Sequence, residues 1–302
     1  MGRSLRISLR VITFYIILLG SQFSWSTTVG LLVDKPSEQI QVFHQKLQAA
    51  LNSDQITLLS SSQLNQAALN DYQKWITLGP NALDALLASR PETPLQILAL
   101  FLPDTAQEKL LEQYPNTFSY LDNRPSLERQ LALINAIMPQ ANHVGIYYSA
   151  MFKLDKKQYA NVGKKYNLTL HWAELRDPLN WDRNAQKVLS NVDIVLGVDD
   201  SALYNATTIR SILMRLYRSG KALIGPDKGY VRAGAVASVY SGVGETLQAA
   251  ASWVKQGHFS PGVIPNPYFD VSVNLQVARS LNIVIQDEAA LVKAIQERAN
   301  EK

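Results

Sequence analysis

The chain of 302 residues has no cysteine and only four histidines. The missing thiols exclude disulfides and cysteine-ligated metal centres. The histidines stand at no spacing typical of a metal site: they are His44, His143, His171 and His258. A Gly-x-Ser-x-Gly nucleophile motif is missing as well, and Gly242 and Gly244 lack the third glycine of a dinucleotide loop. These absences argue against an enzyme and predict neither a metal nor a cofactor.

Excess positive charge is confined to the N-terminus. The formal net charge is +4, but Arg3, Arg6 and Arg10 precede the first acid, Asp34. Without these three arginines, 26 basic residues stand against 25 acidic ones. The basic pI therefore does not indicate a nucleic-acid partner.

The three arginines begin a predicted leader. An apolar run at residues 11–19 follows them, and then Ser24-Trp25-Ser26 forms a small-x-small cleavage site. This pattern is typical of a secretory signal peptide, so we expect residues 1–26 to be removed. The alternative is a membrane anchor, but the run is about half of the roughly 20 residues that a span needs. Because no cysteine is available for a lipid, we expect the mature chain to be free in the periplasm.

Apolar runs alternate with amphipathic stretches along the rest of the chain. This rhythm predicts parallel strands separated by helices. It breaks at residues 122–125 and then restarts, which predicts two Rossmann-like α/β lobes, each with a helix-flanked parallel sheet, hinged around a cleft. Glycine- and proline-containing stretches near 241–244 and 257–267 are interpreted as further crossings. The first lobe is expected over 27–121 plus about 243–264, and the second over 122–242 plus about 265–302. The predicted strands are 28–33, 56–59, 75–78, 95–101, 117–121, 144–148, 168–173, 193–198, 222–224, 235–239 and 269–273.

The most informative stretch is a β-α-β unit around residues 193–224. Its first strand is apolar and rich in β-branched residues, and it stops at Asp199-Asp200-Ser201. Open α/β sheets bind ligands in such loops, at the carboxyl ends of their strands. Two interpretations stay open: one carboxylate caps a helix that begins near Ser201, or one accepts a hydrogen bond from a ligand amine or hydroxyl.

Other polar residues also follow predicted strands, and we expect them at the cleft. Tyr148 and Ser149 are candidates for ligand contact, although Tyr148 is equally compatible with a rim position. The remaining ligand-binding candidates are Asp34, Gly79, Pro80, Asn81 and Asp227, with Asn81 expected to cap a helix over 82–87. Helix N-termini favour a ligand carboxylate, while Asp199 or Asp200 favours an amine. A zwitterionic or otherwise amine-bearing solute is therefore predicted.

Three segments of the second half carry a family resemblance: residues 193–201, 229–238 and 269–283. Together they resemble ABC transporter substrate-binding proteins of the tryptophan- and tyrosine-binding type. The resemblance implies a type I periplasmic-binding fold, and it places Asp199 and Asp200 where the family has an Asp-Asn that meets the ligand. The family's Ala-Thr-Pro-x-Ala-Gln-Ala loop corresponds to residues 78–84, where its threonine and glutamine are replaced.

The resemblance implies a monomeric solute-binding protein that delivers a small amine-bearing or aromatic solute to an ABC permease. The alternative is a ligand sensor that partners a membrane kinase or cyclase. A periplasmic hydrolase using Asp199 and Asp200 is a remote third interpretation, because adjacent side chains project in different directions.

Overall fold

A computed structural model describes residues 28–51, 54–89, 94–256 and 260–300. The predicted leader and its cleavage site lie outside these residues. Within them, no helix has the length and apolar character needed to cross a membrane.

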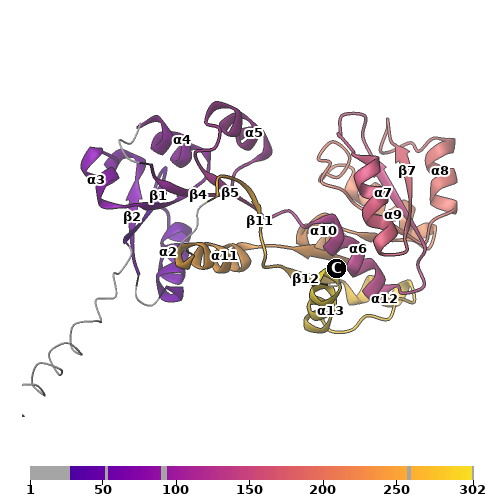
Figure 1. The fold of residues 1–302 in the computed structure, drawn as a ribbon. Helices are drawn as coiled ribbons and strands as arrows, with labels where there is room; N and C mark the ends of the chain where they lie inside the picture. Colours follow the sequence, from indigo (N-terminus) through magenta and orange to yellow (C-terminus); the bar gives the residue numbers. More distant parts are fainter. Residues whose placement is uncertain (1–27, 52–53, 90–93, 257–259, 301–302) are drawn as a thin grey trace, which may run out of the picture. The chain divides into compact units, whose positions relative to one another are not determined.

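The described chain forms two six-stranded sheets (Figure 1). The first has the strand order β11-β5-β4-β3-β1-β2 and the second the order β12-β10-β9-β8-β6-β7. Strand β12 runs antiparallel to β10, whereas β1–β2, β1–β3, β3–β4, β5–β11, β6–β7, β6–β8, β8–β9 and β9–β10 pair in parallel. The strands are β1 (Thr28–Val33), β2 (Gln55–Ser60), β3 (Lys74–Leu78), β4 (Gln96–Leu100), β5 (Ser119–Asp122), β6 (His143–Tyr148), β7 (Thr169–Glu174), β8 (Ile194–Leu196), β9 (Ala222–Ile224), β10 (Ala237–Tyr240), β11 (Gly262–Pro265) and β12 (Asp270–Val273).

Helices connect successive strands, so the predicted α/β architecture with two lobes is confirmed. We call the first sheet with α2–α5 the first lobe, and the second sheet with α6–α10, α12 and α13 the second lobe. The helices are α2 (Glu38–Ala50), α3 (Gln66–Asp71), α4 (Pro80–Ala88), α5 (Asp104–Gln113), α6 (Leu127–Ile137), α7 (Lys156–Lys165), α8 (Arg183–Ser190), α9 (Ile209–Arg218), α10 (Lys228–Ala233), α11 (Val243–Lys255), α12 (Leu275–Ser280) and α13 (Glu288–Asn300), with a short 3₁₀ turn η1 (Ser61–Gln63).

One strand was missed, and two local expectations were wrong. The stretch at 257–267, interpreted from the sequence as a crossing, also contains a strand, β11, which pairs with β5 at the edge of the first sheet, where a proline is tolerated. The helix expected near Ser201 begins only at Ile209, because residues 201–208 form turns. Helix α4 begins at Pro80 with Gly79 as its N-cap, so Asn81 lies inside the first turn and does not cap it.

The compact units of the chain do not follow the sheets strictly. The first unit comprises Met1–Phe118 and Val254–Phe259, and the second Ser119–Trp253 and Ser260–Lys302. Strands β5 and β11 thus count with the second unit although they belong to the first sheet. We name the lobes by their sheets because backbone ladders define the architecture directly. The exact lobe boundaries predicted from sequence stay a prediction.

The predicted crossing segments are hydrogen-bonded to one another within the second unit. The backbone N–H of Asn266 donates to the carbonyl of Asp122 at 2.8 Å, and its side chain donates to Asn123 Oδ1 at 2.8 Å. Ser241 Oγ donates to the carbonyl of Tyr268 at 2.7 Å. Asn266 is buried, so its own two bonds are shielded from water, whereas the bond of Ser241 is exposed.

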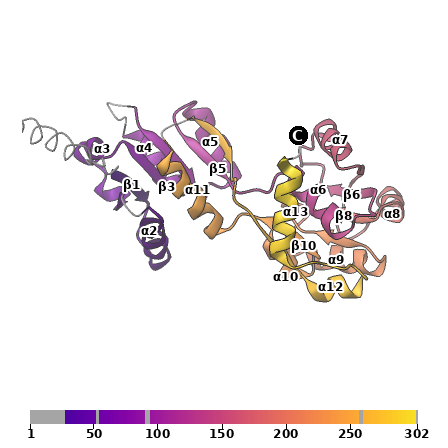
Figure 2. The same ribbon diagram turned by 60° about the horizontal axis from the view of Figure 1, so that its bottom comes forward.

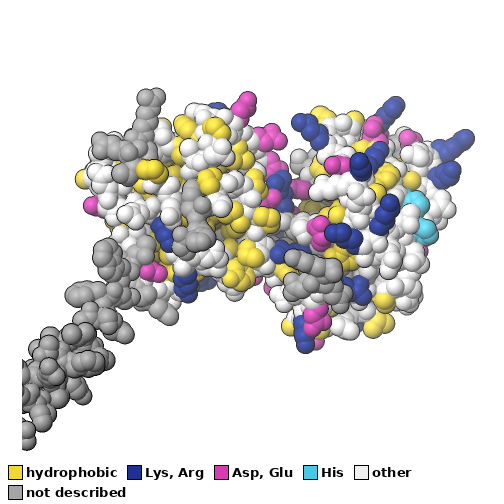
Figure 3. All heavy atoms as spheres, in the orientation of Figure 1, with side chains coloured by type: hydrophobic (Ala, Val, Ile, Leu, Met, Phe, Trp, Pro, Cys, Tyr) yellow, Lys and Arg dark blue, Asp and Glu magenta, His cyan; other side chains and the backbone are white. Residues whose placement is uncertain are grey.

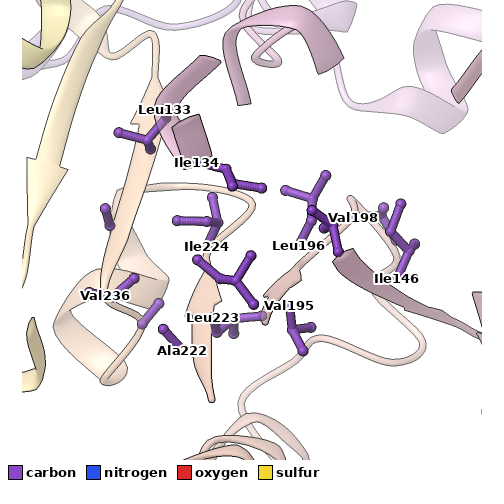
Figure 4. Packing of buried hydrophobic residues seen from close by; sticks show 14 of the residues in the cluster. Leu133, Ile134, Ile146, Val195, Leu196, Val198, Ala222, Leu223, Ile224 and Val236 are labelled. Carbon is purple, nitrogen blue, oxygen red and sulfur yellow. The ribbon is translucent and has the colours of Figure 1, made fainter. Parts of the chain in front are cut away.

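The second lobe has a buried apolar core around β8 (Figure 4). Val195 and Leu196 of this strand are fully buried, and Ile146 of β6 and Ile224 of β9 flank them. Burial on both faces explains why β8 is uniformly apolar. Helix α13 packs along α6 and β12 (Figure 2). This core fixes the strand ends from which the candidate site residues project.

Candidate functional site

The loops after β8 and β9 lie against each other at the carboxyl edge of the second sheet. The N–H of Gly197 donates to the carbonyl of Ile224 at 2.9 Å. A Cβ atom on Gly197 would lie 2.8 Å from Pro226 Cδ, so only glycine permits this approach. The contact brings the Asp199-Asp200 loop and the Asp227 loop to the same place.

Asp200 is a structural residue in this arrangement. Its side chain is buried and accepts hydrogen bonds from Ser149 N at 2.6 Å and Ser149 Oγ at 3.1 Å. It also accepts from the backbone N–H groups of Ala202 at 3.1 Å and Leu203 at 3.3 Å. Of the two interpretations, capping describes Asp200. It caps turns instead of a helix, and it also joins the loop after β8 to the loop after β6. Ser149 is engaged by the same carboxylate.

Asp199, in contrast, is exposed. Its negative charge acts on two tyrosines: burial and then Asp199 raise the pKa of Tyr159, and burial, Asp227 and Asp199 raise the pKa of Tyr230. The carboxyl edge thus carries an exposed acid whose charge acts on two tyrosines, and neither tyrosine was identified from the sequence.

Tyr148 and Asp227 have partners in the protein. Lys156 Nζ lies 5.1 Å from the centroid of the Tyr148 ring, so an ammonium group covers one face of this half-buried ring. Asp227 caps α10 by accepting a hydrogen bond from the N–H of Gly229, and its side chain stays exposed. Tyr148 is the last residue of β6 and Asp227 follows β9, and each already has a local role.

Three tyrosines are linked in series by hydrogen bonds to backbone carbonyls beneath the carboxyl edge of the second sheet. Tyr230 Oη donates to the carbonyl of Tyr204 at 2.6 Å, and Tyr204 Oη donates to the carbonyl of Tyr147 at 3.3 Å. Tyr147 Oη donates to the carbonyl of Ala185 at 3.2 Å. Burial raises the pKa of both Tyr147 and Tyr204, so both stay neutral donors. These bonds tie α8, β6, the loop after β8 and helix α10 to one another.

The candidates of the first lobe are also brought together. Asn81 Nδ2 donates to Asp34 Oδ2 at 3.3 Å, which links the loops after β1 and β3. The N–H of Gly79 donates to the carbonyl of Leu100 at 2.9 Å. Gly79 has φ of +85° with open space at its Cβ position, so glycine is needed there for its backbone conformation. Pro80 follows as the first residue of α4.

Phe101 is a candidate that sequence reasoning missed. It was expected inside a strand over 95–101, but β4 ends at Leu100 and Phe101 has φ of 57°. A bulky residue with positive φ is strained, and such strain concentrates at functional sites. Its ring is 40% exposed and meets the buried Phe43 edge-on, with 6.0 Å between centroids. No sequence signal marks a positive φ at phenylalanine.

Among the described residues, no group of three or more histidine, aspartate or glutamate side chains could hold a metal ion. The sequence profile of ABC transporter substrate-binding proteins matches residues 109–297. The chain belongs to this family. It is an ABC transporter solute-binding protein, and proteins of this extracytoplasmic family are typically not enzymes. The resemblance found in the sequence is confirmed at the level of the family.

One solved structure supports the fold of this substrate-binding protein, and two others match it with lower TM-scores. A substrate-binding protein with adhesive properties from Clostridium difficile, in its ligand-free, open form, gives a TM-score of 0.60 at 12% identity, covering 86% of this chain and 96% of that one. A Streptococcus pneumonia ABC domain in complex with L-Trp gives 0.48 at 16% identity, covering 89% and 98%. A conserved domain protein from Vibrio cholerae gives 0.49 at 17% identity with the same coverages. A comparison with curated protein sequences finds no match.

Proposed function

We propose that this substrate-binding protein captures a small amine-bearing or aromatic solute in the periplasm and delivers it, as a monomer, to an ABC permease. The carboxyl-edge residues of the second lobe would hold the solute, with Asp199 as the group that accepts the amine. The observation that carries the proposal is the contrast in burial between neighbouring acids: Asp200 is buried, whereas Asp199 is exposed and its charge acts on two tyrosines.

Physical chemistry favours a cation at this position. Asp199 and Asp227 both raise the pKa of Tyr230, and they follow β8 and β9, which are neighbouring strands of the second sheet. A solute ammonium group would reduce the repulsion between the two carboxylates, and it would also be attracted to the negative faces of tyrosine rings. In the first lobe, the exposed residue Phe101 offers apolar surface for an aromatic or aliphatic group.

A paired ligand screen tests this proposal. Each amine, including amino acids, aromatic amines and polyamines, is tested by thermal shift beside its analogue that lacks the amine, and sugars serve as neutral controls. A ligand present at about one hundred times its Kd adds roughly 2.7 kcal/mol of stability. We expect at least one amine to raise the melting temperature while its analogue does not. If sugars or deaminated acids stabilise the protein and amines do not, the proposal is wrong.

Native mass spectrometry of freshly purified protein provides an independent measurement. A co-purified solute that carries an amine supports the proposal. A co-purified solute without one contradicts the assignment of Asp199, although it leaves the membership in the binding-protein family intact.

A further inference from the structure

A hollow between α8 and α9 lies on the second lobe and involves none of the site residues described above. Its volume is about 570 Å³. Three arginines line it, Arg210, Arg215 and Arg218, and the described lining includes no acidic side chain. Apolar groups share the same walls: Leu179 is 55% exposed and Met214 is 49% exposed. We call this hollow the α8–α9 groove.

The helix geometry orders these groups into a stripe. Arg210, Met214 and Arg218 are spaced four residues apart on α9, so they lie above one another on one face of the helix. Among the described residues, neither Arg210 nor Arg218 has a salt bridge with an acidic side chain. Along α9 the groove wall therefore presents a cationic, an apolar and again a cationic side chain, and no described acidic side chain forms a salt bridge with either arginine.

Arg215 is held in place beneath this stripe. Its guanidinium carbon lies 5.4 Å from the centroid of the Trp181 ring, and Nη2 donates to the carbonyl of Leu179 at 3.4 Å. Trp181 is buried and its Nε1 donates to the carbonyl of Pro178 at 3.0 Å. A guanidinium fixed on the core loses little side-chain entropy when it binds a partner.

We propose that the α8–α9 groove docks an acidic segment of a partner protein, in which carboxylates flank an apolar side chain. Planar guanidinium groups bind carboxylates with two parallel hydrogen bonds, and Met214 and Leu179 supply adaptable apolar contacts. Arginine and methionine are enriched at protein interfaces. The inference concerns a partner surface and does not depend on which solute the carboxyl edges bind.

Two other occupants fit the groove less well. Binding to anionic lipids typically uses four to eight clustered basic residues on a surface that the membrane can reach, whereas three arginines line a concave hollow here. A single inorganic anion would leave most of a 570 Å³ hollow and both apolar groups unused. A peptide segment uses the charges, the apolar wall and the volume together.

The test uses a fluorescein-labelled helical peptide in which glutamates flank a leucine at a spacing of four residues. Binding to the full mature chain is measured by fluorescence anisotropy at 20 and 150 mM salt. The double charge reversal Arg210→Glu with Arg218→Glu should weaken binding at least tenfold. The matched reversal Arg232→Glu with Arg298→Glu, on exposed positions of α10 and α13, should change it less than twofold. Circular dichroism verifies that every variant is folded.

Met214→Asp tests the apolar part of the stripe, and it should weaken binding at least threefold. Three results would overturn the proposal: no binding by the unmodified protein up to 1 mM peptide, equal losses in the groove and control reversals, or a lysine peptide that binds as well as the glutamate peptide. The last measurement uses vesicles of phosphatidylcholine with 30% phosphatidylglycerol. If the protein binds these vesicles but not the peptide, and the groove reversal abolishes vesicle binding, the proposal of a protein partner is also contradicted.

Discussion

The backbone N–H of Ser149 donates a hydrogen bond of 2.6 Å to the carboxylate of Asp200. The two residues are 51 positions apart and belong to the loops after β6 and β8, so this bond joins two neighbouring loops at the carboxyl edge of the second sheet. Asp200 also accepts from two N–H groups of its own loop. One buried carboxylate thus determines the shape of the edge that carries Asp199.

Removing this carboxylate is expected to destabilise the protein. Asp200→Ala leaves several buried donors without an acceptor, so the free energy of unfolding should fall by about 2–4 kcal/mol. The exposed neighbour provides the control, because Asp199→Ala should cost less than about 1 kcal/mol. Urea denaturation followed by circular dichroism measures both variants. Equal losses would show that the two acids do not have the separate roles assigned to them.

Phe101 allows the backbone strain to be measured separately from the side chain. Phe101→Gly and Phe101→Ala both remove the ring, but only glycine adopts φ of 57° without cost. The glycine variant should therefore be more stable than the alanine variant by about 1 kcal/mol. Thermal and chemical denaturation of the pair check this difference. If the alanine variant is the more stable one, residue 101 is not strained in the way described.

The sequence predicted those features that depend on local patterns. Strand β8 was found because its residues are apolar on both faces, and β11 was missed because Gly262 and Pro265 look like a crossing. Adjacent acids could not be separated, because the choice of Asp200 as the buried one depends on Ser149, a distant residue. The left-handed backbone of Phe101 and the tyrosine chain through Tyr204 arise from tertiary packing, which a single sequence does not reveal.

The two neighbouring histidines of the second lobe predict a pH effect on stability. His143 Nδ1 and His171 Nε2 lie 3.1 Å apart, and Figure 3 shows histidine side chains side by side on this lobe. Burial and then the charge of His143 lower the pKa of His171, while Asp193 opposes them. The unfolded chain therefore binds protons more readily, so stability is full above about pH 6.5 and falls as the pH drops below that value.

The measurement is the melting temperature between pH 5 and 7.5. His171→Gln should lose less stability than the unmodified protein as the pH falls through this range. The conservative variant His44→Gln, in the first lobe, serves as the control and should keep the full dependence. If the melting temperature of His171→Gln falls with pH as steeply as that of the unmodified protein, His171 is not the source of the pH effect.

Asn266 should stabilise the crossing segments through its side chain. Its Nδ2 donates to Asn123 Oδ1 at 2.8 Å, its Oδ1 accepts from Tyr268 N at 2.9 Å, and the residue is 1% exposed. Asn266→Ala should cost about 1–3 kcal/mol of unfolding free energy because it removes two hydrogen bonds, each of which contributes about 0.5–1.5 kcal/mol. Hydrogen exchange should rise near residues 122–126 and 264–268. Unchanged exchange in both segments would show that these bonds do not couple them.

The role of Asp199 in solute binding is tested most directly by isothermal titration of the amine that the paired screen returns. Asp199→Asn keeps the shape of the side chain but removes its charge, and Asp84→Asn on α4 provides the control. The account predicts that Asp199→Asn weakens binding by about 2–5 kcal/mol, which is at least thirtyfold, because an ammonium group loses its charged partner. The control should bind within about twofold of the unmodified protein. If Asp199→Asn binds the amine as tightly as the unmodified protein does, Asp199 is not the amine acceptor and the central claim fails.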